Sequence, residues 1–427
     1  MAGLLSSLNT AKSGMNVSQV AIQTTSHNIS NINTPGYSRQ QVKQTASSAY
    51  STPGSNMSFS AGQIGTGAQI NDVTRVRNTF YDYQFRSESH NYGATSVKYN
   101  YYQNIESIFN EPSDTAISST LNDFFNSWNE LAKDPNSSGV KNVVLESANN
   151  LASSISNAYD KLDSLGNSLN DQQDAILKDI NSKISELKEL DKNIKVIQGS
   201  GKSPNDLLDQ RDSILDELSY KIDITNSDVK KLLETANADG RELTLDDFKK
   251  LGADKVSGEL QGTISMQEDI QKYKDSLTTL ADTVIKTVND KLTGDNMFTN
   301  QSGKIISVSQ TIKDNPDSIT VTADEALKLY NTKNEKLTIG GKDLTINNFY
   351  NSIIQEVGQQ SAAVIRDESN QSKLLSNIDS SRASVSGVSL DEEMINLIQF
   401  QHAYSASAKV LSTIDSLLDV VVNGIVK

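Results

Sequence analysis

The sequence has no cysteine and few of several other residues with special structural roles. Its 427 residues include no Cys, three His, six Pro and one Trp. Without thiols the chain forms no disulfide bond and offers no thiolate nucleophile, and three histidines make a zinc site an unfavoured interpretation. The absence of cysteine is compatible with the cytosol and with the cell exterior alike.

Long apolar runs and an excess of positive charge are also missing. No run of about 18 apolar residues is present, which excludes a membrane-spanning helix. The net charge is −14, which argues against binding to nucleic acid or to an anionic membrane surface. The N-terminus lacks the basic flank, apolar segment and small-residue cleavage site of a secretory signal peptide. Secretion of this chain would therefore need another route.

What the sequence does contain is a high proportion of polar residues in a helical pattern. Hydrophobic residues make up 36% of the chain, which is low for a compact globule and suits long, solvent-exposed helices. The length favours two or three domains. We predict a mainly α, elongated fold of long coiled-coil-like helices, with paired N- and C-terminal helices and a few short β-strands or hairpins.

The first regular pattern is a seam of apolar and small residues at the N-terminus. It advances alternately by four and three residues, which is typical of a helix in a left-handed supercoil. Its members are Leu4, Leu8, Ala11, Met15, Ser18, Ile22, Thr25 and Ile29. Because Ala, Ser and Thr bury little apolar surface, this helix needs a partner.

The helical pattern stops at the stretch NISNINTPGY, residues 28–37. Thr34 is pushed towards an extended conformation by Pro35, and Pro35–Gly36 suits a tight turn. One interpretation is a locally capped turn at the end of a helix. The other is an assembly motif, whose residues would be Asn28, Asn31, Thr34, Pro35, Gly36, Tyr37 and Arg39.

A second seam occupies the C-terminal region from Leu390 to Ile425. Ser389 is placed to cap its helix, and Glu392 lies where a capping box needs a carboxylate. Two complementary seams at opposite ends of one chain predict a helix pair, parallel or antiparallel. The residues that we assign to the terminal helix interface are Leu4, Leu8, Met15 and Ile22, together with Leu390, Met394, Leu397, Leu411 and Leu418.

Both ends of the chain resemble one family. The segments GLLSSLNTAKSGMNVSQVAIQTTSHNISNINTPGYSRQ (3–40) and SLDEEMINLIQFQHAYSASAKVLSTID (389–415) are similar to the termini of bacterial flagellar axial proteins, which are rod, hook and hook-associated proteins. The continuation Tyr37-Ser38-Arg39 is most similar to the hook–filament junction members. Residues 80–225 and 257–385 resemble that group more loosely.

The resemblance implies a structural protein without enzymatic activity, cofactor, metal, nucleic acid or membrane partner. It implies a subunit that joins hook to filament as a ring of copies of itself, in contact with hook protein and with the second junction protein on the filament side. It also implies an export chaperone, flagellar type III export without a cleavable signal peptide, and an extracellular place in the flagellum.

Three alternatives remain open beside this interpretation. One is a hook or rod structural protein, although the middle of such proteins is mostly strand. Another is a secreted coiled-coil protein with an effector role. The third is an enzyme, but no Ser/His/Asp set has a supporting motif, and His27 and His402 lie on helical seams where a packed histidine is expected.

Between the termini the sequence predicts short strands followed by long helices. Residues 37–79 predict two or more strands joined by a Ser/Gly-rich loop at 47–67. Helices are predicted at 80–109 and 115–132. A sustained heptad pattern over 144–197 predicts one rod helix about 80 Å long at ~1.5 Å per residue.

Aromatic residues cluster near three arginines in the region 75–102. Arg75, Arg77 and Arg86 beside a tyrosine-rich stripe form a pattern that binds single-stranded nucleic acid by stacking in some proteins. Helix–helix packing is the favoured interpretation, because the chain is strongly acidic.

The stretch from Gly199 to Ser203 mimics the end of a phosphate-binding loop. It lacks the earlier glycine of that motif, since Val196 stands there, and it follows a helix rather than a strand. We interpret the stretch as helix punctuation, in which Gly199 or Gly201 ends one helix and Ser203 caps the next.

A small acidic insert covers residues 226–256 and has a helix–loop–helix pattern. With Gly240 at the sixth position of a calcium loop, Thr235 stands where an aspartate should begin the loop. A plain polar insert is therefore favoured over a weak calcium site that would use Asp247. Junction proteins usually carry a β-rich outer domain here, so the sequence departs from the family at this place.

The remaining region predicts a helix from about 259, a strand within 304–321, a short strand or hairpin near 335–346 with its turn at Gly340–Gly341, and a helix at 349–378. The predicted domains are a terminal helical pair (1–36 and 386–427), an α-rich rod (37–225 and 257–385) and the insert (226–256). Because the apolar strips at both ends exceed what one thin helix pair can shield, we predict that the termini order fully only on assembly.

Overall fold

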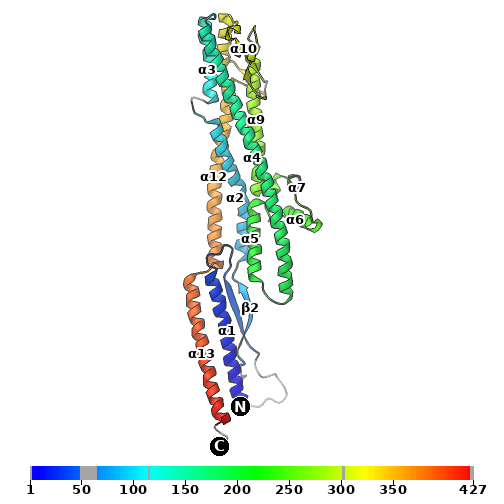
Figure 1. The fold of residues 1–427 in the computed structure, drawn as a ribbon, viewed down its shortest axis with the longest axis vertical. Coiled ribbons are helices and arrows are strands. Elements are labelled where there is room, and N and C mark those ends of the chain that lie inside the picture. The colour runs from blue at the N-terminus through cyan, green and yellow to red at the C-terminus, as the bar shows by residue number, and fades with distance from the viewer. Residues whose placement is uncertain (1, 49–64, 114–115, 301–302, 424–427) are drawn as a thin grey trace.

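The structure is a computed structural model that describes residues 2–48, 65–113, 116–300 and 303–423. These residues form an elongated, mainly helical molecule whose long helices run along its long axis (Figure 1). Three small antiparallel sheets of two strands each complete the described part. The predicted mainly α, elongated fold is confirmed. None of the described helices combines the length and the apolar content needed to cross a membrane.

The terminal helices form one end of the molecule. Helix α1 (Ala2–Ser30) packs along α13 (Leu390–Asn423), and the two chain ends lie together at the end remote from the rod (Figure 1). The pair is therefore antiparallel, which decides between the two predicted orientations.

A hairpin packs on the outer side of this pair. Strand β1 (Gln40–Ala46) pairs with β2 (Ala68–Arg75), with a bulge between Lys43 and Gln44. The predicted strands are confirmed, but they lie against α1. They thus pack with the terminal pair, although they lie within residues 37–79, which we assigned to the rod. The predicted Ser/Gly-rich loop lies mostly outside the described residues.

The rod consists of long helices that pack side by side (Figure 1). The six main helices are α2 (Thr79–Phe109), α3 (Ile117–Lys133), α4 (Ser138–Gly199), α5 (Asn205–Lys221), α9 (Gly258–Asn289) and α12 (Ile346–Ser386). Helix α4 has 62 residues, so it is about 93 Å long at ~1.5 Å per residue. It starts before the predicted Val144 because Ser137 caps it, accepting a hydrogen bond from the Val140 N–H.

The main core of the rod lies between α2, α3, α4 and α9. The heptad positions of α4 supply fully buried residues that include Val144, Leu151, Ile155 and Leu162. Helix α3 contributes an aromatic group in which Trp128 meets Phe124 edge to face, at 6.1 Å between ring centroids. The predicted apolar period therefore marks the true inner face of these helices.

The outer tip of the rod is a compact group of short elements. They are β3 (Phe298–Thr299), β4 (Ser307–Val308), α10 (Gln310–Asp314), a 3-10 turn (Pro316–Ser318), α11 (Ala323–Asn331), a second 3-10 turn (Thr332–Asn334), β5 (Leu337–Ile339) and β6 (Lys342–Leu344). The predicted turn at Gly340–Gly341 is confirmed, since both residues have positive φ. Helix α12 begins three residues before the predicted Phe349, capped by Thr345.

The insert is a folded helical module. Its helices are α6 (Ser227–Asp239), α7 (Leu245–Leu251) and α8 (Ala253–Val256). Val229 and Phe248 are fully buried in a second apolar core shared with α4 and α5. The insert has the predicted helix–loop–helix pattern, and apolar side chains spaced along its short helices pack it against the rod.

The α4–α5 connection differs from its prediction in one detail. Gly201 has a φ of 78° after the end of α4, as helix punctuation requires. Helix α5 begins at Asn205, and Ser203 does not cap it: its hydroxyl donates to Asp72 Oδ2 at 2.7 Å. Ser203 thus ties this connection to the hairpin.

Candidate assembly interface

Asn28 is the centre of the predicted turn motif and is almost fully buried. Its Nδ2 donates to the Gln40 carbonyl (2.9 Å) and to Glu393 Oε2 (3.0 Å). Its Oδ1 accepts from the Gln40 N–H (2.9 Å) and from the Tyr37 hydroxyl (2.7 Å). Both donors and both acceptor positions are used. One side chain therefore joins α1, β1 and α13.

The turn itself follows the conformation that its residues favour. The Tyr37 N–H donates to the Thr34 carbonyl at 3.2 Å, and Gly36 has a φ of 76°. Pro35 and Gly36 thus occupy the central positions of a tight turn of the type II pattern. Asn31 Nδ2 donates to the His27 carbonyl and Asn31 Oδ1 accepts from the Thr34 hydroxyl, which caps the end of α1 locally. The contacts of Asn31 and Thr34 are therefore those of local helix capping.

Tyr37 lies over the end of α1 among acidic groups. Its hydroxyl is 3.0 Å from His27 Nδ1, and its ring meets the His27 ring edge to face. Burial raises the pKa of Tyr37 well above its ordinary value, and Asp206, Asp209 and Glu393 raise it further. The hydroxyl therefore stays protonated and remains a donor to Asn28. His27 is exposed, as is His402, so neither is the packed histidine that the seams predicted.

Arg39 links the turn to the connection between α12 and α13. Its N–H donates to the Ser386 carbonyl at 2.9 Å. Its Nη1 donates to Glu392 Oε2 at 2.8 Å. Glu392 was predicted as a capping-box partner of Ser389, and its carboxylate instead faces Arg39. The turn motif therefore gathers residues from both ends of the chain.

The helix pair covers part of the thin N-terminal seam. Leu4, Leu8, Met15 and Ile22 are partly buried, and the small seam residues Ala11, Ser18 and Thr25 are buried. A Cβ added to Gly14 would lie 3.2 Å from Ser407 Oγ. The two backbones therefore approach closely, which small residues allow.

The C-terminal seam is only partly used within the molecule. Leu397, Leu411 and Leu418 are partly buried and Ile414 is 6% exposed. Leu390 and Met394, which belong to the same predicted seam, are 45% and 48% exposed. Those two positions add little to the pair inside one chain.

The exposed large apolar residues of α13 lie along its length and on more than one face, and together they are here called the α13 ribbon. Its members are Leu390, Met394, Ile395, Ile398, Val410, Leu417, Val420 and Val422. Each is between 45% and 65% exposed. An exposed apolar surface of this extent marks an interaction surface.

The arginines of the aromatic stripe are engaged within the chain. Arg75 bridges Asp209 and Asp212 at 2.7 and 2.8 Å, and Arg86 bridges Asp212 and Asp216. These guanidinium groups are therefore not offered to a phosphate backbone, which removes the basis of the nucleic-acid alternative. The sequence pattern did not point to the aspartates of α5. The available signal was their spacing of three and four residues, opposite the apolar face of that helix.

The acidic insert does not arrange its carboxylates around a common point. Asp247 accepts from Arg241 at 2.8 Å and from the Thr244 N–H and hydroxyl, as part of a capping box. The Arg241 hydrogen bond comes first among the causes that hold the pKa of Asp247 far below its ordinary value. Within the described ranges, no group of three or more His, Asp or Glu could hold a metal ion.

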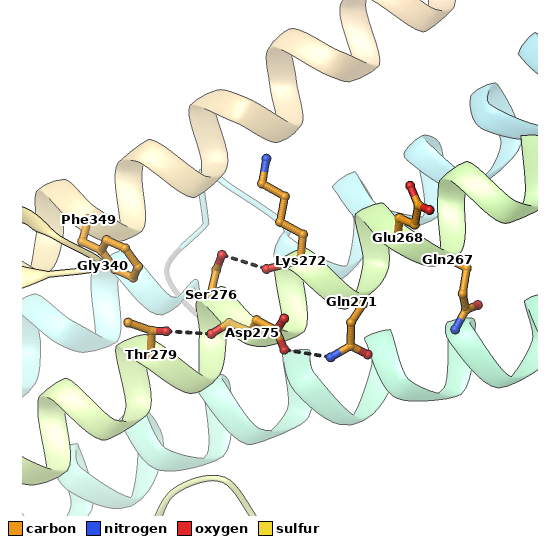
Figure 2. Close-up of a pocket in the computed structure, with 9 residues that line it drawn as sticks. All are labelled: Gln267, Glu268, Gln271, Lys272, Asp275, Ser276, Thr279, Gly340 and Phe349. Atoms are coloured by element: carbon orange, nitrogen blue, oxygen red, sulfur yellow. Dashed lines mark hydrogen bonds between the residues drawn. The ribbon is translucent and has the colours of Figure 1, made fainter. Parts of the chain in front are cut away.

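The surface of α9 carries an open groove of about 650 Å³ (Figure 2). Several of its polar side chains bond within their own helix: Gln271 donates to Asp275, and Ser276 and Thr279 donate to backbone carbonyls one turn earlier. Lys272 pairs instead with Glu356 of α12. Phe349 and Gly340 close the far side. The groove brings together no nucleophile and base, so it suits packing rather than catalysis.

Three family models match separate parts of the chain. Residues 102–237 match the one described as the flagellar hook-associated protein FlgK helical domain. Residues 8–37 match the flagella basal body rod protein model, and residues 371–424 match the C-terminal model of the flagellar basal body rod FlgEFG proteins. The first of these two rod-type matches covers most of α1 and its turn, and the second covers the end of α12 and the whole of α13.

Curated relatives belong to the same group. Flagellar hook-associated protein 1 of Bacillus subtilis is 30% identical over 98% of this chain and 97% of its own length. The proteins of that name from Salmonella typhimurium and Escherichia coli are 28% and 26% identical over 50% and 51% of this chain, and 37% and 39% of their own. The flagellar hook junction protein FlgK of Burkholderia pseudomallei matches with a TM-score of 0.39 and 17% identity, over 51% of this chain and 46% of that one.

Proposed function

Because this chain belongs to the flagellar hook-associated protein 1 family, we propose that it joins the hook to the filament and assembles through its paired terminal helices. The family has a structural role in the flagellum, and its partners are axial flagellar proteins. We propose that this chain contacts those partners and its own copies through α1 and α13. It rests on one observation, the α13 ribbon that α1 leaves uncovered.

Copies of the chain supply the cover that the single molecule lacks. Covering a half-exposed Leu or Ile gains about 1 kcal/mol, half of the ~1.5–3 kcal/mol for full burial. Covering the eight residues of the ribbon would together stabilise a ring by several times this free energy for each copy. In the proposed ring the terminal pair lies at the inner wall, and the rod makes the lateral contacts outside it.

The turn motif serves this assembly by holding the pair in place. Asn28, Tyr37 and Arg39 connect α1 to the start of α13, while Asn31, Thr34, Pro35 and Gly36 shape the turn. We propose that these residues act through the terminal pair and need not touch a neighbouring copy. Leu390 and Met394 would contact the neighbour directly.

Export and location follow from the same proposal. The chain would leave the cell by flagellar type III export and take its place outside, between hook protein and the second junction protein. An export chaperone would hold α13 before secretion, because a bare apolar helix face favours aggregation. Binding of the chaperone to a synthetic peptide of residues 390–423, and its loss when Ile398 is replaced by Asp, would test that part.

Electron microscopy of a deletion strain tests the proposed function. The expected result is cells that carry hooks without filaments and release filament protein into the medium, restored by the intact gene. A hook or rod protein would give no complete hooks, and a secreted effector would leave motility unchanged. Either result would contradict the junction role.

A second experiment tests the coupling of folding to assembly. Circular dichroism of the soluble monomer should show less helix than the assembled state, because the free ends of α1 and α13 lack their cover. Equal helicity in the two states would argue that the pair is fully formed before assembly.

A further inference from the structure

Eight charged residues meet where the terminal helices join the rod, and we call them the joint cluster. They come from β2, from the connection that follows it, and from α2, α5 and α12. The members are Arg75, Arg77, Arg86, Arg382, Asp82, Asp209, Asp212 and Asp216. Four positive and four negative side chains balance in charge.

Helix α5 supplies the acidic side of the joint cluster. Asp209, Asp212 and Asp216 follow one another by three and four residues, which puts their carboxylates on one helix face. Asp212 accepts from Arg75 at 2.8 Å and from Arg86 at 3.1 Å, and lies 3.4 Å from Arg77. It therefore holds arginines from three parts of the chain at once.

The cluster is largely removed from water. The four arginine side chains are 12–20% exposed and the four aspartates 8–16%. Pairs of this kind are screened by salt much less than surface pairs. Removing one partner leaves a buried charge without compensation, so the members act as a unit.

The cluster spans both covalent connections between the terminal helices and the rod. Arg75 and Arg77 flank the path from β2 to α2, and Arg77 pairs with Asp82 in the first turn of α2 at 2.7 Å. Arg382, in the last turns of α12 before α13, pairs with Asp216 at 2.5 Å and lies over the Phe85 ring. One helix face of α5 thus holds the two connections together.

The backbone of the turn is tied to the same point. The Ser38 N–H donates to Asp209 Oδ2 at 3.0 Å, and Arg77 donates to the Ser38 hydroxyl at 3.2 Å. Because α1, β2, α2 and α12 all end or begin here, a change of angle between the terminal helices and the rod would break several of these bonds together.

We infer that the joint cluster locks the angle between the base of the terminal helices and the rod, so that this angle is fixed before the free ends of α1 and α13 order in the assembly. The angle is held by ion pairs that are largely buried at the joint, and not by contacts on the surface. It sets the direction in which the α13 ribbon faces before any neighbour arrives. The inference concerns the single chain and stands whether or not the ring of the proposed function is correct.

Single-molecule Förster resonance energy transfer on the monomer tests whether the angle between the terminal helices and the rod is fixed. Since the chain has no cysteine, Cys introduced at the exposed positions Ser26 of α1 and Asp171 of α4 accepts one donor and one acceptor dye. Ser26 lies near Asn28, away from the free end of α1. The expected distribution is narrow and stays so in about 1 M salt, where the Debye length is about 3 Å.

Two variants and a control decide the outcome. D212N should broaden and shift the distribution while the helical signal is retained, and R382Q should do so to a smaller extent because it frees α12 alone. D191N, which removes the half-exposed Arg211–Asp191 pair, should leave the distribution unchanged. An unchanged distribution in D212N would overturn the lock. Should D212N lose its helical signal, an unchanged distribution in R382Q would overturn it.

Discussion

Asn28 and Glu393, which stand 365 positions apart in the sequence, meet in a buried hydrogen bond of 3.0 Å. The Glu393 side chain is 3% exposed, so its carboxylate has little access to water. The contact closes the joint between the first helix of the chain and the last. The two termini are therefore connected by a specific polar contact as well as by the apolar seam.

Replacing Asn28 should destabilise the terminal pair. Asn28→Ala removes the hydrogen-bond partner that Asn28 gives to Glu393 and to the Gln40 N–H, at a cost of about 1–3 kcal/mol for each group left unsatisfied. We expect a lower free energy of unfolding in urea, with a larger loss for Asn28→Asp, which brings two carboxylates together. Asn16→Ala, on the exposed side of α1, is the control and should change little. Equal stability of N28A and N16A would contradict the proposed role of Asn28.

A charge introduced into the α13 ribbon should prevent assembly and leave the folding of the monomer unaffected. Ile398 is 50% exposed, so Ile398→Asp should change the stability of the monomer by no more than about 0.5 kcal/mol. The same substitution should abolish ring formation and swimming. Ile414→Asp, at a 6% exposed position, should instead destabilise the monomer, because it buries a charge against α1. Normal motility of the I398D strain would show that the ribbon is not an assembly surface.

The stability of the chain should fall in two steps as the pH decreases. Burial lowers the pKa of His90 below 6.5, against the opposing pull of Asp223. Because the folded state holds this proton less tightly than the unfolded state, its contribution is present above about pH 6.5 and is lost as the pH falls through the folded pKa. Urea unfolding between about pH 7 and about pH 5 should therefore show declining stability.

His90→Gln should flatten that first step, whereas His402→Gln, at an exposed position, should leave it unchanged. A second step is expected below pH 3.8. Burial opposes the ionisation of Asp212, but Arg77, Arg75 and Arg86 outweigh it and hold the pKa of Asp212 below 3.8. Stability present above that pH is lost as Asp212 takes up its proton. A flat profile from neutral to acid pH would refute both assignments.

The turn motif should be sensitive to its glycine. Gly36 has a φ of 76°, and an added Cβ would lie 3.4 Å from the Ser213 Cβ. Gly36→Ala should cost roughly 1–2 kcal/mol, the strain of an L residue in the left-handed region. Gly199→Ala is the matched control, because nothing lies within 4 Å of its added Cβ and its φ is not positive. A G36A protein as stable as G199A would show that the turn has no defined conformation.

The helices of the rod could be predicted because the apolar period is a local property. Val144, Leu151 and Leu162 mark the inner face of α4 before any partner is known. The turn at Pro35–Gly36 could be predicted for the same reason, since two adjacent residues suffice to define it.

The joint cluster could not be predicted, because its partners are far apart in sequence. Arg75 and Asp212 are separated by 137 positions, and no periodicity connects them. The exposure of Leu390 and Met394 could not be predicted either. Helix α13 has apolar residues on more than one face, so the apolar period does not say which face meets α1. The packing of the insert against the rod could not be predicted, because Val229 and Phe248 are single buried residues on short helices.

The antiparallel course of α1 and α13 has a practical consequence for labelling this protein in cells. It brings both described chain ends to the same extremity, beyond the rod (Figure 1). In the proposed ring the terminal pair lies at the inner wall, so a fluorescent protein fused to either end would crowd the centre of the ring. The turn after α6 offers a better place for an epitope tag: Gly240 is exposed there, and nothing lies within 4 Å of its added Cβ.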